Sequence, residues 1–387
     1  MIRSLLRNKI TKYVMMPIVA IALLVLIGGG WYFSSVIEED GFRVDNADPT
    51  PNLKVVAITD DSITLEQLPD TEEAENLSVS AKWGVTDGAN YGELGNLISD
   101  SGGLITRQYQ ASLGGFRVGH EVYLDRTTVP HDPSGRYLFE EVVIQSDIGE
   151  IDAWYFPVTG SASYPSESTD TWAIYVHGRT SNRDIFLNKM SLPGVNSLVI
   201  DYRNDEGAPP SDSGYYDFGT TEWRDVEASV QYALDHGAKK IVLVGNSMGG
   251  GIVVNYQLKS DLASYTTGMI LDAPMLNFGR TVDKGAEERS VPPPITAAAK
   301  IFATLRFGVD WKALDYLSHA DKLTVPVLLF HGEADDTVPV ETSIEFAEAA
   351  PDIVELHTYK NVGHVEAWNY HPIEYREFLT EFIERVR

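Results

Sequence analysis

Residues 241–251 contain a serine whose surroundings can make it a nucleophile. The apolar run IVLV at 241–244 leads straight into GNSMG at 245–249, and a helix pattern follows. When a buried strand turns into a helix through Gly-x-Ser-x-Gly, the serine hydroxyl is held exposed at the tip of the turn. The glycines let the strand and the helix approach, and the free N–H groups of a helix N-terminus favour a developing negative charge. The pattern therefore predicts that Ser247 is a catalytic nucleophile.

A nucleophilic serine needs a histidine that takes its proton and a carboxylate that orients the histidine. Acidic residues follow two of the later apolar runs: Asp272 follows TGMIL, and Glu333, Asp335 and Asp336 follow PVLLFHG. Histidines stand at positions 331, 357, 364 and 371. His364 follows the last apolar run, in a segment, NVGH, whose composition indicates a loop. The residue types alone leave several pairs of acid and base open.

Residues 137–387 have the rhythm of a sheet covered by helices. EEVVIQ and IDAWYFPV flank a turn at 147–149, which predicts an antiparallel edge hairpin. Beyond them, apolar strands alternate with amphipathic helices, so we expect a mostly parallel sheet with helices on both faces. Residues 279–322 interrupt this alternation, and their VPPP and AAAKIFATL stretches predict a small cap insert.

The preceding segment divides into two parts. Residues 38–52 are polar and contain proline, as a tether does, whereas residues 53–136 show short strands and turns. KVVAIT and SITLEQL flank Asp60-Asp61 and predict a hairpin. We expect 53–136 to form a small β-rich accessory segment without chemistry of its own, in which His120 and His131 have structural roles.

An uncharged stretch near the N-terminus predicts a membrane anchor. Residues 13–37 carry no charge, and Val14–Phe33, at about 1.5 Å per residue, can cross the roughly 30 Å core of a bilayer. The charges before it are all basic: Arg3, Arg7, Lys9 and Lys12. A cleaved signal peptide is the alternative, but GGGWYFSSV is a poor cleavage site. We therefore expect residues 1–37 to form a cytoplasmic flank and a single-pass anchor, with the rest of the chain outside the cytoplasm.

Composition narrows the classes of function. The 387 residues include 56 acidic and 30 basic side chains, which give a formal net charge of −26. Such a surface repels phosphates, so we expect no nucleic-acid partner. The chain has no cysteine, which excludes disulfides, thiolate catalysis and cysteine-based zinc sites. We predict neither a metal nor a cofactor.

Taken together, these motifs resemble those of the serine hydrolases of the α/β-hydrolase superfamily. The resemblance covers residues 137–387 through HGRTSNR, DYRN, GNSMGG, GEADDTVP and NVGH. It points to the prolyl-oligopeptidase-like and acylaminoacyl-peptidase-like branch, as found in membrane-anchored bacterial hydrolases. Members often read DYRG, whereas this chain reads DYRNDEG, a departure at one edge of the expected pocket.

The resemblance implies an assignment for the acid and the base. In this superfamily the nucleophile, the acid and the histidine follow one another along the chain, each on a loop after a strand. GEADDTVP is similar to the acid loop G-x-x-D-x-x-V-P, which implies Asp335 as the acid. Some relatives place the acid where Asp272 stands, so Asp272 is the alternative. His364 is then the base, because it follows the last strand.

The same resemblance implies an oxyanion hole. Two converging backbone N–H groups are needed, and Met248, directly after the nucleophile, supplies one. The HGRT motif at 177–180 implies that Arg179 supplies the other. The side chain of Arg179 or of Arg183 is either a surface charge or a pocket group that attracts an acidic moiety.

The expected reaction is hydrolysis of a carboxylic ester or amide through an acyl-Ser247 intermediate. The substrate would be a small-molecule ester or a peptide-like molecule. The cap insert favours small apolar esters, whereas the resemblance favours aminopeptidase or acylaminoacyl-peptidase activity. Transfer of the acyl group to a cell-envelope acceptor would use the same residues. A non-catalytic surface binding protein is the least favoured reading, because the triad and the oxyanion motif are intact.

Overall fold

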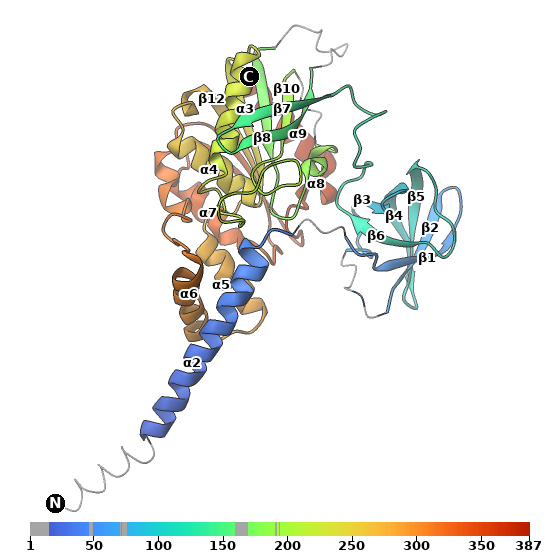
Figure 1. The fold of residues 1–387 in the computed structure, drawn as a ribbon. Helices are drawn as coiled ribbons and strands as arrows, with labels where there is room; N and C mark the ends of the chain where they lie inside the picture. Colours follow the sequence, from blue (N-terminus) through green and yellow to red (C-terminus); the bar gives the residue numbers. More distant parts are fainter. Residues whose placement is uncertain are drawn as a thin grey trace, which may run out of the picture.

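The computed structural model describes residues 15–45, 49–69, 71, 76–158, 169–189, 192 and 194–387. It consists of a long N-terminal helix, a small barrel and a larger domain built on one sheet (Figure 1). The basic residues that precede the predicted anchor lie outside the described residues.

The larger domain is organised around an eight-stranded sheet in the order β14-β13-β12-β11-β9-β10-β8-β7. Its strands are β7 (Glu140–Ser146), β8 (Gly149–Phe156), β9 (Thr171–Val176), β10 (Asn196–Ile200), β11 (Lys240–Asn246), β12 (Thr266–Asp272), β13 (Val327–Gly332) and β14 (Val354–Tyr359). The predicted hairpin is β7–β8, and β8 also pairs antiparallel with β10. The remaining neighbours are parallel. The predicted fold, a mostly parallel sheet, is confirmed.

Helices cover both faces of this sheet, because apolar side chains project from its strands on both sides. One face is covered by α3 (Trp223–Asp235), α4 (Met248–Lys259) and α7 (Val340–Ala349). The other face is covered by α9 (Pro372–Val386) and the short η3 (Arg183–Phe186). Two further short helices of this domain are η4 (Ala263–Tyr265) and α8 (Ala367–Tyr370). The loops after β9, β11, β13 and β14 therefore open at the same edge of a fully covered sheet.

The predicted anchor forms a single helix, α2 (Met16–Ile37), with Pro17 in its first turn, where a proline costs no hydrogen bond. Among the described residues it is the one helix long and apolar enough to cross a membrane. A π-helical turn, η2 (Glu38–Phe42), continues it into the segment that the sequence assigns to a tether. Phe42 is buried in the core of the larger domain and packs edge-on against Phe278. The beginning of that segment is thus part of the fold.

Between β12 and β13 the chain forms three helices, α5 (Phe278–Glu288), α6 (Pro293–Phe307) and η5 (Leu317–Lys322). Prolines occupy the first turn of α6, and Gly308 ends the helix in the left-handed conformation. α6 lies alongside the end of α2 that is nearest the larger domain (Figure 1). The insert is therefore packed against the predicted anchor.

The β-rich segment closes into a six-stranded antiparallel barrel in the order β1-β2-β5-β4-β3-β6. Its strands are β1 (Leu53–Ile58), β2 (Ser62–Gln67), β3 (Trp83–Thr86), β4 (Tyr91–Ser101), β5 (Leu104–Leu113) and β6 (Glu121–Asp125). The predicted hairpin around Asp60-Asp61 is β1–β2. β1 also pairs with β6, which closes the barrel around its own apolar core. Closure leaves no open sheet edge in this part of the chain.

Candidate active site

Ser247 occupies the sharp turn between β11 and α4. Its backbone has φ 51° and ψ −119°, a conformation that a residue with a side chain rarely adopts. The glycines around it are required by close packing: a Cβ on Gly245 would lie 2.6 Å from the carbonyl oxygen of Gly249, and one on Gly249 would overlap the carbonyl oxygen of Val176. The strand and the helix therefore hold the Ser247 hydroxyl at the tip of the turn, as the motif predicts.

The structure brings Ser247, His364 and Asp335 together from three separate loops. His364 Nε2 lies 2.8 Å from Ser247 Oγ, and His364 Nδ1 lies 2.7 Å from Asp335 Oδ2. Asp335 follows β13 and His364 follows β14, so both loops emerge at the same edge of the sheet as the turn at Ser247. This geometry suits proton transfer from the serine to the imidazole, with the carboxylate orienting the ring.

Asp335 is buried and accepts several hydrogen bonds. Its Oδ1 accepts from the N–H groups of Thr337 and Val338, at 2.9 and 2.8 Å. Burial by itself would raise the pKa of this carboxyl, but His364 and His331 outweigh burial and hold the pKa well below its ordinary value. Asp335 is therefore an anion across the neutral pH range, as an orienting carboxylate must be.

His331 is a contributor to the site that the sequence did not identify. It is fully buried, and its Nε2 lies 3.1 Å from Asp335 Oδ2. Its Nδ1 lies 2.7 Å from the hydroxyl oxygen of Ser343, so both ring nitrogens have partners. The available signal was the spacing of four residues between His331 and Asp335.

The other candidates for acid and base lie elsewhere. The Asp272 carboxylate is buried and accepts from Lys189 Nζ and from the Tyr375 hydroxyl, each at 3.0 Å. Asp272 supports the turn in another way, because its backbone oxygen accepts the N–H of Ser247 at 2.9 Å. His357, in β14, stacks on Phe378 of α9, with ring centroids 3.7 Å apart.

The predicted oxyanion donors lie beside Ser247. Met248 is the first residue of α4, and a Cβ placed on Gly178 would lie 3.6 Å from Ser247 Oγ, which puts the 177–179 loop against the nucleophile. Met248 and Arg179 are the residues whose backbone N–H groups the sequence predicts as donors to an oxyanion on an atom bonded to Ser247.

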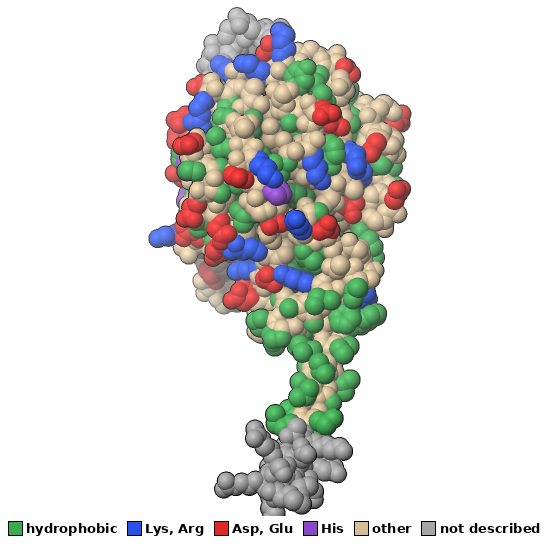
Figure 2. Space-filling model, turned by 90° about the vertical axis from the view of Figure 1, so that its left-hand side faces the viewer, with side chains coloured by type: hydrophobic (Ala, Val, Ile, Leu, Met, Phe, Trp, Pro, Cys, Tyr) green, Lys and Arg blue, Asp and Glu red, His purple; other side chains and the backbone are tan. Residues whose placement is uncertain are grey.

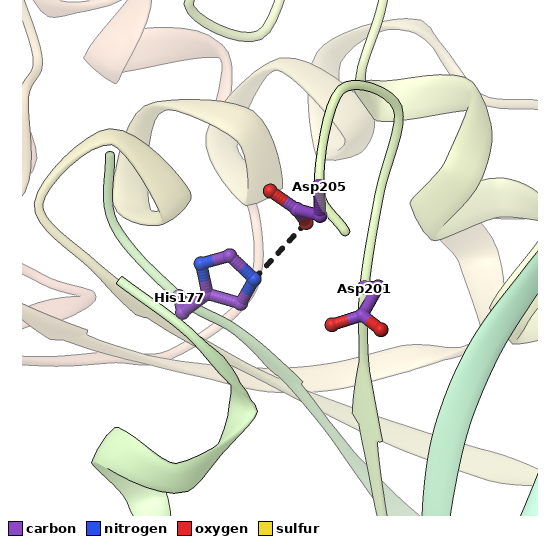
Figure 3. Close-up of side chains that lie close together, drawn as sticks. All are labelled: His177, Asp201 and Asp205. Carbon is purple, nitrogen blue, oxygen red and sulfur yellow. Dashed lines mark ion pairs between the residues drawn. The ribbon is translucent and has the colours of Figure 1, made fainter. Parts of the chain in front are cut away.

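A buried cluster of His177, Asp201 and Asp205 supports the 177–179 loop (Figure 3). His177 Nε2 lies 3.1 Å from Asp205 Oδ2, and Nδ1 lies 2.9 Å from the carbonyl oxygen of Gly178. Burial lowers the pKa of His177, but Asp205 outweighs it and raises the pKa to about 8. Burial also raises the pKa of Asp201 to about 7, although Arg183 Nε lies 3.1 Å from its Oδ1.

Ligand atoms of these three side chains lie within 4.8 Å of one another, as in a metal site. Protein partners are already present, however, because Arg183 pairs with Asp201 and the Tyr202 N–H donates to Asp205. Asp205 lies in DYRND, where this chain departs from the DYRG that members of the superfamily often have. A residue of the segment that differs at this edge of the pocket is therefore the ion-pair partner of His177. We interpret the cluster as an ion-pair network that fixes the loop before Arg179.

The Arg179 side chain points to the N-terminal part of the chain. Its Nη2 donates to the backbone oxygens of Glu39 and Arg43, each at 3.3 Å. Arg183 instead pairs with Asp201 and stacks over the Trp154 ring. Arg179 also lines a cavity of about 750 Å³ between α2, α5 and α6, which reaches Asp336 and Thr337 on the acid loop.

The barrel is attached to the segment that follows His364. Asn369 Nδ2 donates to the backbone oxygens of Lys82 and Arg126, at 2.7 and 2.9 Å. Asn76 donates to Glu366, at 3.1 Å, and Glu366 accepts the N–H of Gly363, the residue before His364. No local pattern in the sequence indicated these contacts.

His131, for which a structural role is expected, links the barrel to the larger domain. It lies 2.8 Å from Asp125 in β6 and 3.3 Å from Asp184 in η3. Burial lowers the pKa of His131, but the two carboxylates outweigh it and raise the pKa to about 9. The histidine is therefore a cation that bridges two anions at neutral pH.

Comparisons with known proteins cover the larger domain. A family model described as the Alpha/beta hydrolase family matches residues 173–378. The protein YqkD of Bacillus subtilis (strain 168) is 26% identical over 243 residues, which are 60% of this chain and 77% of YqkD. YfhR of Escherichia coli (strain K12) is 22% identical over 241 residues, which are 60% of this chain and 76% of YfhR.

Solved structures share the fold. The esterase Pf2001 of Pyrococcus furiosus aligns with a TM-score of 0.51 and 23% identity, over 66% of this chain and 94% of its own. A puromycin-hydrolyzing peptidase of Mycobacterium tuberculosis aligns with a TM-score of 0.53 and 18% identity, over 84% of this chain and 51% of its own. At these identities the likeness concerns the fold alone.

Proposed function

This chain belongs to the alpha/beta hydrolase family, and on that premise we propose that it is a serine hydrolase which cleaves a carboxylic ester through an acyl-Ser247 intermediate. The observation that carries the proposal is the continuous line of hydrogen bonds from Ser247 Oγ through the His364 imidazole to Asp335. The esterase that shares the fold supports an ester as the substrate.

The geometry supports a two-stage reaction. His364 Nε2 accepts the Ser247 proton while Oγ bonds to the carbonyl carbon, and the N–H groups of Met248 and Arg179 stabilise the resulting oxyanion. The bond to the leaving group then breaks, and His364 returns the proton to the departing alcohol. A water molecule attacks the acyl-enzyme in the same way, which releases a carboxylic acid and free Ser247. Asp335 keeps the imidazole oriented and stabilises its protonated form.

An amide substrate is the second candidate, because the fold shared with a peptidase spans 84% of this chain. The two candidates are separated by kcat/KM for p-nitrophenyl butyrate against aminoacyl p-nitroanilides, since this ratio reports differential binding of the transition states. We expect the ester to be cleaved faster, and Ser247→Ala to lose that activity. Faster cleavage of the anilide, lost in the same variant, would make the protein a peptidase.

We also propose that α2 is retained as a membrane anchor and that the hydrolase domain lies outside the cytoplasm. The packing of the end of α2 supports retention over cleavage, because Gly30 and Ser34 are buried and Phe42 belongs to the core beyond. Removal of α2 as a signal peptide would expose that packing. Protease added to intact cells should degrade the domain, and full protection would contradict this topology.

A further inference from the structure

Helix α6 has two faces that are packed and one that is not. Its first face meets α2: a Cβ on Gly30 would lie 2.7 Å from Ala298 Cβ, and the rings of Trp31 and Phe302 lie 5.7 Å apart. Its second face is buried against the larger domain through three small side chains, Thr296, Ala299 and Ala303. The third face points away from both.

This third face is apolar and uncharged. Ile301 is 62% exposed and Leu305 is 73% exposed, one helical turn apart. The two cations of α6 are turned away from the face, because Lys300 pairs with Asp283 and Arg306 donates to the backbone oxygen of Trp31. Figure 2 shows hydrophobic side chains gathered where α2 meets the body of the molecule. An exposed apolar face of this kind is stabilised by burial against a protein partner or a membrane, not by contact with water.

The position of α6 along α2 favours the membrane. The predicted span is Val14–Phe33, and the glycines and Trp31 that contact α6 belong to its last five residues. At about 1.5 Å per residue, these contacts with α6 then lie roughly 3–6 Å inside the outer edge of the hydrocarbon. An interfacial helix buries its apolar face at about this level, near the boundary of headgroups and acyl chains. Trp31 and Tyr32, both more than half exposed, lie at the same level.

The cavity between α2, α5 and α6 runs from this level to the loops that carry Arg179 and Asp336, next to the candidate active site. Phe33, the last residue of the predicted span, lines one part of it. Arg179 and Asp336, the neighbours of the oxyanion hole and the acid, line another. Its other apolar lining comes from Val36, Ile37, Phe278, Val282 and Val291. An acyl chain that leaves the outer leaflet beside α2 can therefore follow apolar side chains as far as the loops that carry Arg179 and Asp336, next to the candidate active site.

The charges that line the cavity select against anionic molecules. The lining holds five carboxylates, those of Glu39, Asp40, Asp45, Glu288 and Asp336. Two guanidinium groups oppose them, and both are engaged: Arg289 pairs with Asp40 at 2.6 Å, and Arg179 donates to backbone oxygens. A phosphate or sulfate headgroup would meet net negative charge. An uncharged headgroup would not be repelled by this charge.

We propose that α6 lies in the outer leaflet beside α2, and that the enzyme takes its substrate from that leaflet, as an uncharged amphiphilic ester whose acyl chain enters the cavity between α2, α5 and α6. This inference rests on the proposed hydrolase function and on the anchor, and it gives the site a substrate class. A monoacylglycerol is the simplest molecule of that class.

The position of α6 can be tested without an assay of activity. Because the chain has no cysteine, Leu305→Cys and Ile373→Cys each give one site for an NBD fluorophore in the full-length protein. Ile373 is the matched control, since it is 76% exposed and lies on α9, which covers the sheet face away from α3 and α4. In phosphatidylcholine vesicles, nitroxide on a lipid acyl chain should quench the label at 305, and aqueous iodide the label at 373. Iodide quenching of both labels to the same degree would overturn the docking of α6.

The route of the substrate is tested with two esters, monooleoylglycerol in phosphatidylcholine vesicles and p-nitrophenyl butyrate in solution. The double variant Ile301→Asp/Leu305→Asp should lower the ratio of lipid to soluble cleavage about tenfold or more, because aspartates are costly in the bilayer. The ratio cancels any loss common to both substrates, and Ile373→Asp should not change it. An unchanged ratio in the double variant would overturn the route. If the wild-type protein does not cleave p-nitrophenyl butyrate at all, the proposed hydrolase function is refuted instead.

The proposed preference for uncharged over anionic esters can be measured separately. In the same neutral vesicles, the wild-type protein should cleave monooleoylglycerol about tenfold faster than an oleoyl lysophosphatidylglycerol, because the anionic headgroup is repelled by the carboxylates of the cavity. Equal or faster cleavage of the anionic ester would overturn the assignment to uncharged amphiphiles.

Discussion

Two regions flank the candidate active site and are attached to it in opposite ways. The barrel is joined by directional hydrogen bonds, such as those of Asn369, to the segment that carries His364. The α2–α6 pair is joined by close apolar packing, with the hydrogen bonds of Arg306 to α2 at one end, beside the loops that carry Arg179 and Asp336. The barrel interface thus includes several side-chain hydrogen bonds, whereas α6 leaves Ile301 and Leu305 exposed.

The two attachments constrain the active site differently. Hydrogen bonds depend on angle and distance, so the barrel can fix the position of the His364 loop. Apolar packing is non-directional and scales with the area removed from water, so the α2–α6 side can hold a cavity whose occupant is selected by the side chains of its lining. We therefore expect changes on the barrel side to alter stability and turnover, and changes on the helix side to alter the choice of substrate.

The largest effect expected from this comparison is a difference in kcat between variants of two adjacent residues of the acid loop. Asp335 contacts His364, toward the barrel side, whereas Asp336 lines the cavity on the helix side. Asp335→Asn should lower kcat about 10⁴-fold, because the histidine loses its orienting anion. Asp336→Asn should keep kcat within about tenfold of the wild type, because its carboxylate does not touch the imidazole. Steady-state kinetics on p-nitrophenyl butyrate measures both kcat values. A larger loss in Asp336→Asn than in Asp335→Asn would assign the acid to Asp336.

The second effect tests the directional character of the barrel interface. Asn369→Leu leaves the backbone oxygens of Lys82 and Arg126 without their donor, which should lower the free energy of unfolding by about 2 kcal/mol. We also expect kcat to fall, because the His364 loop loses support. Urea unfolding measures the first effect, with Asn96→Leu on the exposed surface of β4 as the matched control. An equal, small change in both variants would mean that the interface is not held by these bonds.

A third effect is a dependence on pH. The pKa of His131 is raised to about 9 in the folded protein, above its ordinary value of 6.5. Its contribution to stability is therefore complete below pH 6.5 and is lost as the pH rises through 9. Because the side chain is 40% exposed, we expect only about 1 kcal/mol. Urea unfolding between pH 6 and 9.5 should show this decline, and His131→Gln, unlike His371→Gln, should make it shallower, with the part that His177 contributes up to about pH 8 remaining.

The smallest effect belongs to the helix side. Arg289 and Asp40 form an ion pair at 2.6 Å between α5 and η2, but both side chains are about half exposed. Arg289→Ala should change the free energy of unfolding by no more than about 0.5 kcal/mol, because exposed ion pairs contribute little. A loss above about 2 kcal/mol, measured by urea unfolding, would show that this side is also held by directional contacts and would erase the contrast.

The sequence predicted the sheet and the candidate triad because their signals are local. Apolar runs mark the strands, and Ser247, Asp335 and His364 each stand in a short motif at a strand end, so a parallel sheet brings them to one edge. Other features have no local signal. The buried Phe42 is a single apolar residue within EEDGF, and His331 lies inside an apolar strand. The contacts of Asn369 with the barrel join residues more than 240 positions apart.

The proposed hydrolase function depends on Ser247 being the nucleophile. The purified full-length protein should be incubated with a fluorophosphonate, digested and mapped by mass spectrometry. We predict a single adduct, on Ser247, which is absent in Ser247→Ala and slowed in His364→Ala, together with a loss in kcat that approaches 10⁶-fold. An adduct on another serine, or turnover retained in pure Ser247→Ala protein, would contradict the account.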